Sequence, residues 1–203
     1  STLVKLMNRF YDVSRGMIEI NGVDIRKYDL ESLRAQIGYV AQKAHMFKGS
    51  IRSNICFGKP DASDEEMVHA ATVAQASDFI SKREHGYLDE IAEDGTNISG
   101  GQKQRLSIAR VILKKPSLYI YDDSFSALDF KTDATLRKAL KPEVKDAIFF
   151  VVAQRISTIM DSDMIIVLDE GQIIGMGTHT QLLKDCRVYQ EIAHSQLTQK
   201  ELD

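Results

Sequence analysis

The chain has 203 residues, of which 43% are hydrophobic, and it can bury a substantial core as one domain or two tightly joined lobes. Its formal net charge of −3 gives no excess of positive charge, so direct binding to nucleic acid or an acidic membrane is not indicated. Cys56 and Cys186 lie far apart without C-x-x-C spacing, which favours two buried thiols over a disulfide or a zinc site.

The apolar residues recur with helical or strand periodicity along most of the chain. In chain order they predict a helix at 3–7, a hairpin at 17–25, a helix at 30–36, a strand at 37–40, a helical block at 64–82, a helix at 102–113, strands at 118–121, 147–152 and 164–168 separated by helices at 132–140 and 155–160, a turn at 170–172, and polar helices to Asp203. Strands that alternate with helices predict a parallel sheet covered on both faces. The longest fully apolar run, residues 147–153, is too short to cross a bilayer, so a membrane function requires another segment or chain.

The segment 97–105, Asn-Ile-Ser-Gly-Gly-Gln-Lys-Gln-Arg, places a Gly-Gly pair where a helix begins. Backbone N–H groups without a neighbouring Cβ can approach a phosphate, and the positive end of the helix dipole points to the same place. A Gly-Gly pair before a helix is by itself more often an ordinary loop. Here an apolar strand that ends in Asp122 and Asp123 follows, and then residues 126–129, Ser-Ala-Leu-Asp.

These motifs together resemble the nucleotide-binding domain of an ATP-binding cassette transporter. Residues 98–102 resemble its signature motif, residues 119–123 its Walker B strand and residues 126–129 its D-loop. Residues 47–55 and 92–95 resemble the exporter branch of the family, although Asp94 stands where an arginine is usual.

The resemblance implies a P-loop NTPase-like α/β fold, with a mostly parallel sheet and an inserted helical signature subdomain. It divides the chain into a catalytic core lobe, at 1–45 and 114–203, and a helical subdomain at 46–113. The chain begins inside the motif that ends the Walker A loop, so the N-terminal strands and that loop are expected to be missing. We therefore expect the 203 residues alone to bind ATP poorly and to be inactive.

The resemblance also implies ATP and Mg²⁺ as cofactors. The positions that match the family's nucleotide-binding motifs are Ser1, Thr2, Gln42, Asp122, Ser99, Gly100, Gly101, Gln102 and Asp129. Of these, Ser1, Gln42 and Asp122 occupy the metal-binding positions. Independently of the family, Asp122 closes an apolar strand at the carboxyl edge of the predicted sheet, where ligands of open α/β folds bind.

Two departures from the family pattern matter most. Asp123 stands where a glutamate polarises the attacking water, and a shift of about 1 Å in such a group can lower the rate about 100-fold. Gln154 stands where the family has a histidine, and a neutral glutamine cannot carry the proton of an imidazole. Together they predict the degenerate subunit of a heterodimeric exporter, whose signature motif completes the active site of a partner cassette.

The resemblance implies a second nucleotide-binding domain as partner and a transmembrane domain outside this chain, which would hold it at the cytoplasmic face of a membrane. Two alternatives stay open, a regulatory module that dimerises on ATP without useful hydrolysis and a homodimeric exporter that hydrolyses slowly. A chromosome-organising or repair ATPase would call for long heptad segments or a basic surface, which the sequence lacks.

Overall fold

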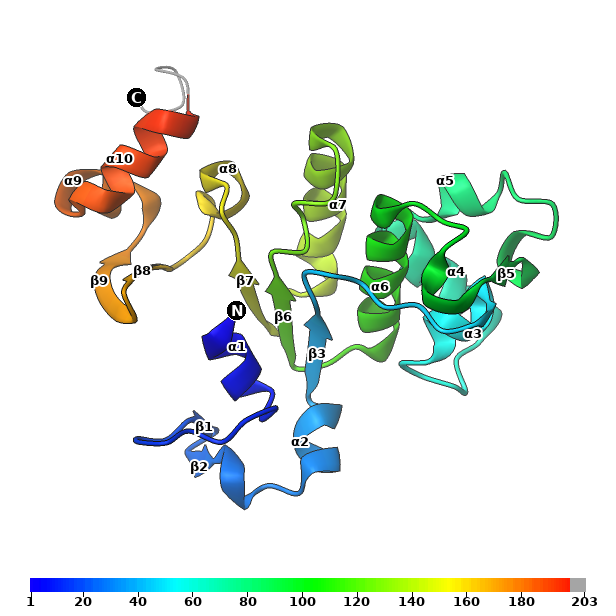
Figure 1. The fold of residues 1–203 in the computed structure, drawn as a ribbon, viewed down its shortest axis with the longest axis horizontal. Helices are drawn as coiled ribbons and strands as arrows, with labels where there is room; N and C mark the ends of the chain where they lie inside the picture. Colours follow the sequence, from blue (N-terminus) through cyan, green and yellow to red (C-terminus); the bar gives the residue numbers. More distant parts are fainter. Residues whose placement is uncertain (198–203) are drawn as a thin grey trace. The chain divides into compact units, whose positions relative to one another are not determined.

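The computed structural model describes residues 1–197, which form two compact units, one from Ser1 to Val152 and one beginning at Ala153 (Figure 1). The first unit contains α1 (Thr2–Met7), β1 (Glu19–Ile20), β2 (Val23–Asp24), the 3-10 turn η1 (Ile25–Lys27), α2 (Leu30–Ala35), β3 (Ile37–Val40), β4 (Gly49–Ser50), α3 (Ile51–Cys56), α4 (Asp64–Val73), α5 (Ser77–Ile80), η2 (Gly86–Leu88), β5 (Glu90–Ile91), η3 (Glu93–Gly95), α6 (Gly100–Lys114), β6 (Leu118–Asp122), α7 (Phe130–Glu143) and β7 (Ile148–Val152). The predicted lobe boundaries at 45/46 and 113/114 stay a prediction.

The central element of the first unit is a three-stranded sheet in the order β3-β6-β7, with β6 in the middle (Figure 1). Both ladders are parallel, and Tyr121 of β6 is paired with Val40 of β3 and with Val151 of β7. The strands predicted at 37–40, 118–121 and 147–152 are confirmed to within a residue. Because the strands are parallel, the segments that follow β3 and β6 leave the sheet at the same edge.

Alternate residues of β6 face two different cores. Tyr121 packs with Phe149 of β7, at 4.9 Å between ring centroids, in a cluster that also contains buried residues of α6 and α7. Ile120 points to the other face, where it shares a cluster with Val4 of α1 and Leu33 of α2. The prediction of helices on both faces of a parallel sheet is therefore confirmed, and both faces anchor β6 in place.

Helix α6 packs very closely on the sheet at Gly38 of β3. A Cβ atom there would lie 2.5 Å from Cγ1 of Val111 and 2.6 Å from Cγ of Pro116. Only glycine fits without displacing these side chains, so Gly38 fixes the spacing between α6 and β3.

The predicted helical block at 64–82 is two helices, α4 and α5. Gln75, with a φ of 58°, lies between them, and this left-handed conformation interrupts the helical hydrogen bonding. At the other end of α4, Ser63 and Glu66 form a capping box.

The hairpin predicted around Asn21-Gly22 is confirmed by the antiparallel pair β1–β2. Asn21 and Gly22 have φ angles of 52° and 75°, as a two-residue turn of this kind requires.

The second unit contains α8 (Ile156–Ile159), β8 (Ile165–Asp169), β9 (Gln172–Gly177), α9 (His179–Asp185) and α10 (Arg187–Gln196). The predicted turn is confirmed, since Glu170 and Gly171 adopt positive φ and join β8 to β9. The alternation of strands and helices predicted a parallel neighbour for β8, whereas the ladder that the structure gives it is the antiparallel one with β9. The predicted C-terminal helices correspond to α9 and α10, and residues 198–203 lie outside the described range.

Both cysteines are buried free thiols, as predicted. Within residues 1–197, no helix combines the length and the apolar character needed to span a bilayer.

Candidate active site

The candidate site is built around Asp122, the last residue of β6. Its carboxylate is buried, with 2% of the residue exposed, and both of its oxygens accept a hydrogen bond. Ser1 Oγ donates to Oδ1 at 2.8 Å, and the hydroxyl of Tyr39 donates to Oδ2 at 3.0 Å. Ser1 precedes α1 but makes no side-chain cap, so its hydroxyl is directed to Asp122 instead of to the helix.

Asp123 follows Asp122 in a left-handed conformation, with a φ of 49°. Its N–H donates to the carbonyl of Val152 at 2.8 Å, and its carbonyl accepts from Ser126 Oγ at 2.7 Å. Gln42 Nε2 donates to its Oδ2 at 3.0 Å. The backbone thus turns sharply at the end of β6, and this turn brings the Asp123 carboxylate to the loop that follows β3.

The structure therefore brings together Ser1, Gln42, Asp122 and Asp123, four residues singled out from the sequence. Thr2, the first residue of α1, is adjacent to Ser1 and exposed. The hydroxyl, carboxylate and amide groups of these residues offer the oxygen ligands that Mg²⁺ prefers. Proteins usually hold Mg²⁺ with one or two carboxylates together with substrate phosphates. Among the described residues there is no cluster of three or more His, Cys, Asp or Glu side chains able to hold a metal by itself. The donors fit a magnesium ion that arrives with a phosphate ligand.

The Gly-Gly segment begins α6, and Ser99 is its N-cap. Ser99 Oγ accepts from the N–H of Gln102 at 3.2 Å, while Gln102 Oε1 accepts from the N–H of Ser99 at 3.0 Å. This capping box satisfies the amides of Ser99 and Gln102. The first amides of a helix have no partner within it, so those of Gly100 and Gly101, together with the proton of the Ser99 hydroxyl, are the donors that an anion would meet.

Two contacts connect the start of α6 to other motifs. Gln104 Nε2 donates to the carbonyl of Ala41, the residue before Gln42, at 3.1 Å. A Cβ on Gly101 would lie 3.4 Å from the carbonyl oxygen of Ala127, so Gly101 packs beside residues 126–129. The sequence did not single out Gln104, and a buried glutamine within an amphipathic helix carries no signal for such a contact.

Asp129 has a structural role that the sequence reading did not assign. It is the N-cap of α7, where Oδ1 accepts from the N–H of Thr132 at 2.9 Å and Oδ2 from its hydroxyl at 2.7 Å. Both hydrogen bonds lower the pKa of Asp129, and the one from the backbone N–H has the larger effect. The preference for aspartate at an N-cap could have revealed this contact.

The loop with Asp94 is also connected to α6, because Lys103 Nζ donates to the carbonyl of Asp94 at 2.6 Å. Gln154 belongs to the second unit, where its carbonyl accepts from Gln196 Nε2 at 2.9 Å. Its predicted role near a phosphate stays a prediction.

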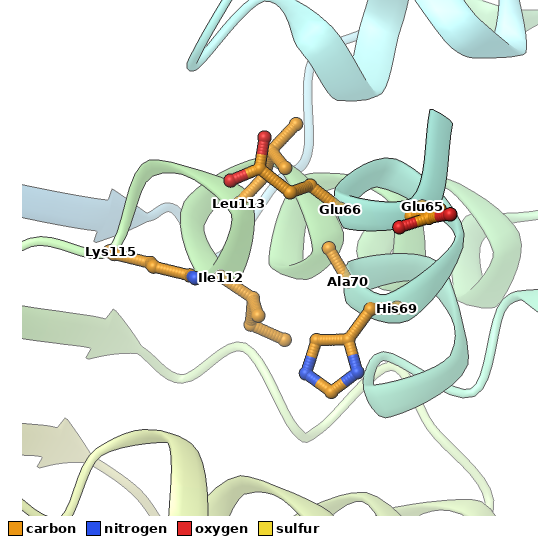
Figure 2. Close-up of a pocket in the computed structure, with 7 residues that line it drawn as sticks. All are labelled: Glu65, Glu66, His69, Ala70, Ile112, Leu113 and Lys115. Atoms are coloured by element: carbon orange, nitrogen blue, oxygen red, sulfur yellow. The ribbon is translucent and has the colours of Figure 1, made fainter. Parts of the chain in front are cut away.

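A separate surface pocket of about 250 Å³ lies between α4 and α6 (Figure 2). It is lined by Glu65, Glu66, His69, Ala70, Ile112, Leu113 and Lys115. His69 Nε2 lies 2.8 Å from Glu143 Oε1 of α7, which ties the rim of the pocket to that helix. No residue of the candidate site lines this pocket.

A parallel α/β sheet with buried carboxylates at its carboxyl edge, and a glycine pair at a helix N-terminus, defines a domain suited to phosphate ligands. The family model described as "ABC transporter" matches residues 1–126. The chain therefore belongs to the ABC transporter family, and it has the α/β fold of the ATP-binding domain of exporter type.

Individual relatives are similar over nearly the whole chain. The ATP-binding/permease protein YgaD of Bacillus subtilis (strain 168) is 49% identical over 183 residues, which are 90% of this chain and 32% of that protein. Heavy metal tolerance factor 1 of Caenorhabditis elegans is 42% identical over 200 residues, 98% of this chain and 25% of that protein. A solved structure described as a bacterial Atm1-family ABC exporter with ATP bound has a TM-score of 0.93 and 38% identity, covering 96% of this chain and 34% of its own. The chain thus spans about a third or less of the length of these relatives.

Proposed function

We propose that this chain is the ATP-binding domain of an exporter and couples ATP binding and hydrolysis to transport across a membrane. The observation that carries the proposal is the cluster of Ser1, Gln42, Asp122 and Asp123 at the carboxyl edge of the sheet, in a chain that belongs to this family. The likeness to an exporter described as having ATP bound supports it. A transmembrane domain outside this chain would hold it at the cytoplasmic face of the membrane.

The residues at the sheet edge would bind the metal and the phosphates. Asp122 would hold Mg²⁺ through water, Ser1 Oγ would coordinate it directly, and Gln42 would contact it with its amide oxygen while its nitrogen stays on Asp123. Thr2 would donate to an inner phosphate. When bound there, the metal would supply positive charge to neutralise the charge that develops on the phosphate oxygens.

We propose further that hydrolysis at this chain's own site is slow. The Asp123 carboxylate is one methylene shorter than a glutamate, and it already accepts a hydrogen bond from Gln42. The carboxylate of Asp123 would therefore lie farther from a water beside the terminal phosphate. A displacement of about 1 Å in a catalytic group can lower the rate of hydrolysis about 100-fold. Gln154 would donate a hydrogen bond to that phosphate but cannot exchange a proton with it.

The signature segment would act on the ATP of a partner cassette. The amides of Gly100 and Gly101 and the hydroxyl of Ser99 would donate to its phosphates, with Gln102 holding the helix end through the capping box. Asp129 is the N-cap of α7, and this contact would hold residues 126–129 in the position where they meet the partner's nucleotide. The partner would be a second, different cassette, and residues 46–113 would form the subdomain that carries the signature segment to it.

The experiment uses the full-length protein, assembled with a partner whose catalytic glutamate has been substituted, so that ATP turnover reports this chain's site alone. We expect very slow turnover, and a rise of about 10- to 100-fold when Asp123→Glu and Gln154→His are combined. Asp61→Glu, at an exposed position, is the matched control and should change nothing.

Three other outcomes separate the alternatives. Turnover of the native site as fast as that of the double variant would contradict a weakened site. ATP-dependent association without turnover in either form would favour the regulatory module. A purified complex that contains only this subunit, in two copies, would favour the slow homodimeric exporter.

A further inference from the structure

Tyr39 contacts the candidate site from a strand that carries none of the residues predicted to act there. It lies in β3, where it is paired with Ile120 of β6, and its hydroxyl donates to Asp122 Oδ2 at 3.0 Å. Ser1 Oγ donates to the other oxygen, Oδ1, at 2.8 Å. A buried carboxylate is therefore held by two hydroxyls that come from separate elements.

The ring of Tyr39 is itself fixed by packing. Phe10 meets it edge-on, with 5.6 Å between ring centroids and an interplanar angle of 75°. The guanidinium of Arg34 in turn lies over the Phe10 ring, with its carbon 5.5 Å from the ring centroid. The phenolic hydroxyl of a tyrosine is protonated at neutral pH, so that of Tyr39 can donate to the Asp122 carboxylate.

We propose that Tyr39 is a positioning residue that orients the Asp122 carboxylate for the divalent metal. This inference rests on the proposed function, because it requires that Asp122 hold the metal. The terminal torsion of an aspartate side chain is broad, so the carboxylate plane is not fixed by the side chain itself. A hydroxyl on Oδ2 fixes that plane, so Oδ1, beside Ser1 Oγ, is the oxygen that would serve the metal.

A purely structural role for the Tyr39 hydroxyl makes a different prediction. If the hydroxyl only satisfies a buried oxygen, its removal lowers the stability of the fold and leaves metal affinity unchanged in the molecules that stay folded. If it orients a ligand of the metal, its removal weakens metal binding, typically by about 10- to 100-fold, in protein that is still folded.

The experiment compares Tyr39→Phe with Tyr28→Phe in the full-length protein. Tyr28 is a matched control because its hydroxyl also donates one hydrogen bond, to the carbonyl of Ile20 at 3.0 Å, and makes no contact with Asp122. Mn²⁺ is the probe, and its binding is measured by electron paramagnetic resonance in the presence of a non-hydrolysable ATP analogue. Binding of the analogue without metal is measured in parallel.

We expect Tyr39→Phe to weaken Mn²⁺ binding at least about 10-fold, with unchanged binding of the analogue in the absence of metal. Tyr28→Phe should bind Mn²⁺ like the native protein. Mn²⁺ affinity of Tyr39→Phe within about twofold of native would overturn the inference.

Asp122→Asn separates this inference from the proposed function. If Asp122→Asn keeps native Mn²⁺ affinity, the proposed metal site itself is wrong. If it loses Mn²⁺ while Tyr39→Phe does not, only the positioning role is wrong. If Tyr39→Phe fails to fold, Phe10→Leu is the second variant. Phe10 is exposed, and its substitution removes the aromatic contact that holds the Tyr39 ring, so Mn²⁺ binding should weaken to a smaller extent. Native affinity in Phe10→Leu would then overturn the inference.

Discussion

Gly100 offers a direct test of whether the glycine pair serves the fold or a ligand. It is the first residue of α6, it does not have a positive φ, and a Cβ built on it meets no atom within 4 Å. Nothing among residues 1–197 therefore requires glycine at this position. We expect Gly100→Ala to fold normally and to lose function, because the new methyl group stands where a phosphate of the partner's nucleotide would approach.

The two effects have opposite signs. Alanine in place of glycine within a helix adds about 0.5–1 kcal/mol of stability, and less at the first position. A gain of about 1 kcal/mol corresponds to a rise of about 2–4 °C in the unfolding midpoint of a domain of this size. Displacing the bound phosphate by about 1 Å is expected to lower turnover about 100-fold.

The assay measures ATP turnover and thermal unfolding of the full-length protein for Gly100→Ala and the native form. The expected result is an unfolding midpoint that is unchanged or slightly higher, together with a large loss of turnover. Native turnover would refute the idea that a ligand approaches this glycine. A lower midpoint would show that glycine is needed for the fold instead.

Three further outcomes are expected. Ser99→Ala and Ser63→Ala each remove a capping box and should each cost about 1 kcal/mol of stability, but only Ser99→Ala should lower ATP turnover; equal turnover in both would contradict a ligand role for Ser99. Gly38→Ala should destabilise the domain by about 1–3 kcal/mol in urea unfolding, because its methyl group would overlap α6, and a neutral result would refute the close packing. Arg26→Gln should raise the pKa of Asp24 from about 2 toward 3.8 in an NMR titration, because the hydrogen bond from Arg26 is the main cause of the shift. Since the folded pKa is depressed, stabilisation by this pair is present above about pH 4 and is lost as the pH falls toward 2; an unchanged titration of Asp24 would contradict this.

The spacing of apolar residues and the residue types found in turns were enough to predict the elements that depend on local sequence. The three strands of the parallel sheet are short apolar runs, and the turn at Asn21-Gly22 uses residues that accept positive φ at low cost. The break between α4 and α5 was missed because Gln75 is not a residue type that marks a left-handed turn. β8 pairs with β9 in an antiparallel hairpin. The alternation of strands and helices along the sequence does not show which strand β8 pairs with.

The candidate site was predictable only where its motifs are contiguous in sequence. Asp122 ends β6 and Asp123 follows it, so the residues themselves indicate this pair. Ser1 and Gln42 lie far away in the sequence and were predicted from the family resemblance alone, and the structure shows that they contact this pair. Tyr39 could not be found in this way, because its contact depends on the register of β3 against β6 and not on any sequence spacing.

The measurement that tests the central claim most directly is ATP turnover of the full-length protein, with its partner, for Asp123→Asn and the native form. If hydrolysis takes place mainly at the partner's site, most of the turnover should survive the substitution, and ATP should still bind. A fall of about 100-fold in turnover with ATP binding intact would identify Asp123 as the carboxylate that activates water. The proposal that ATP is hydrolysed mainly at the partner's site would then be wrong.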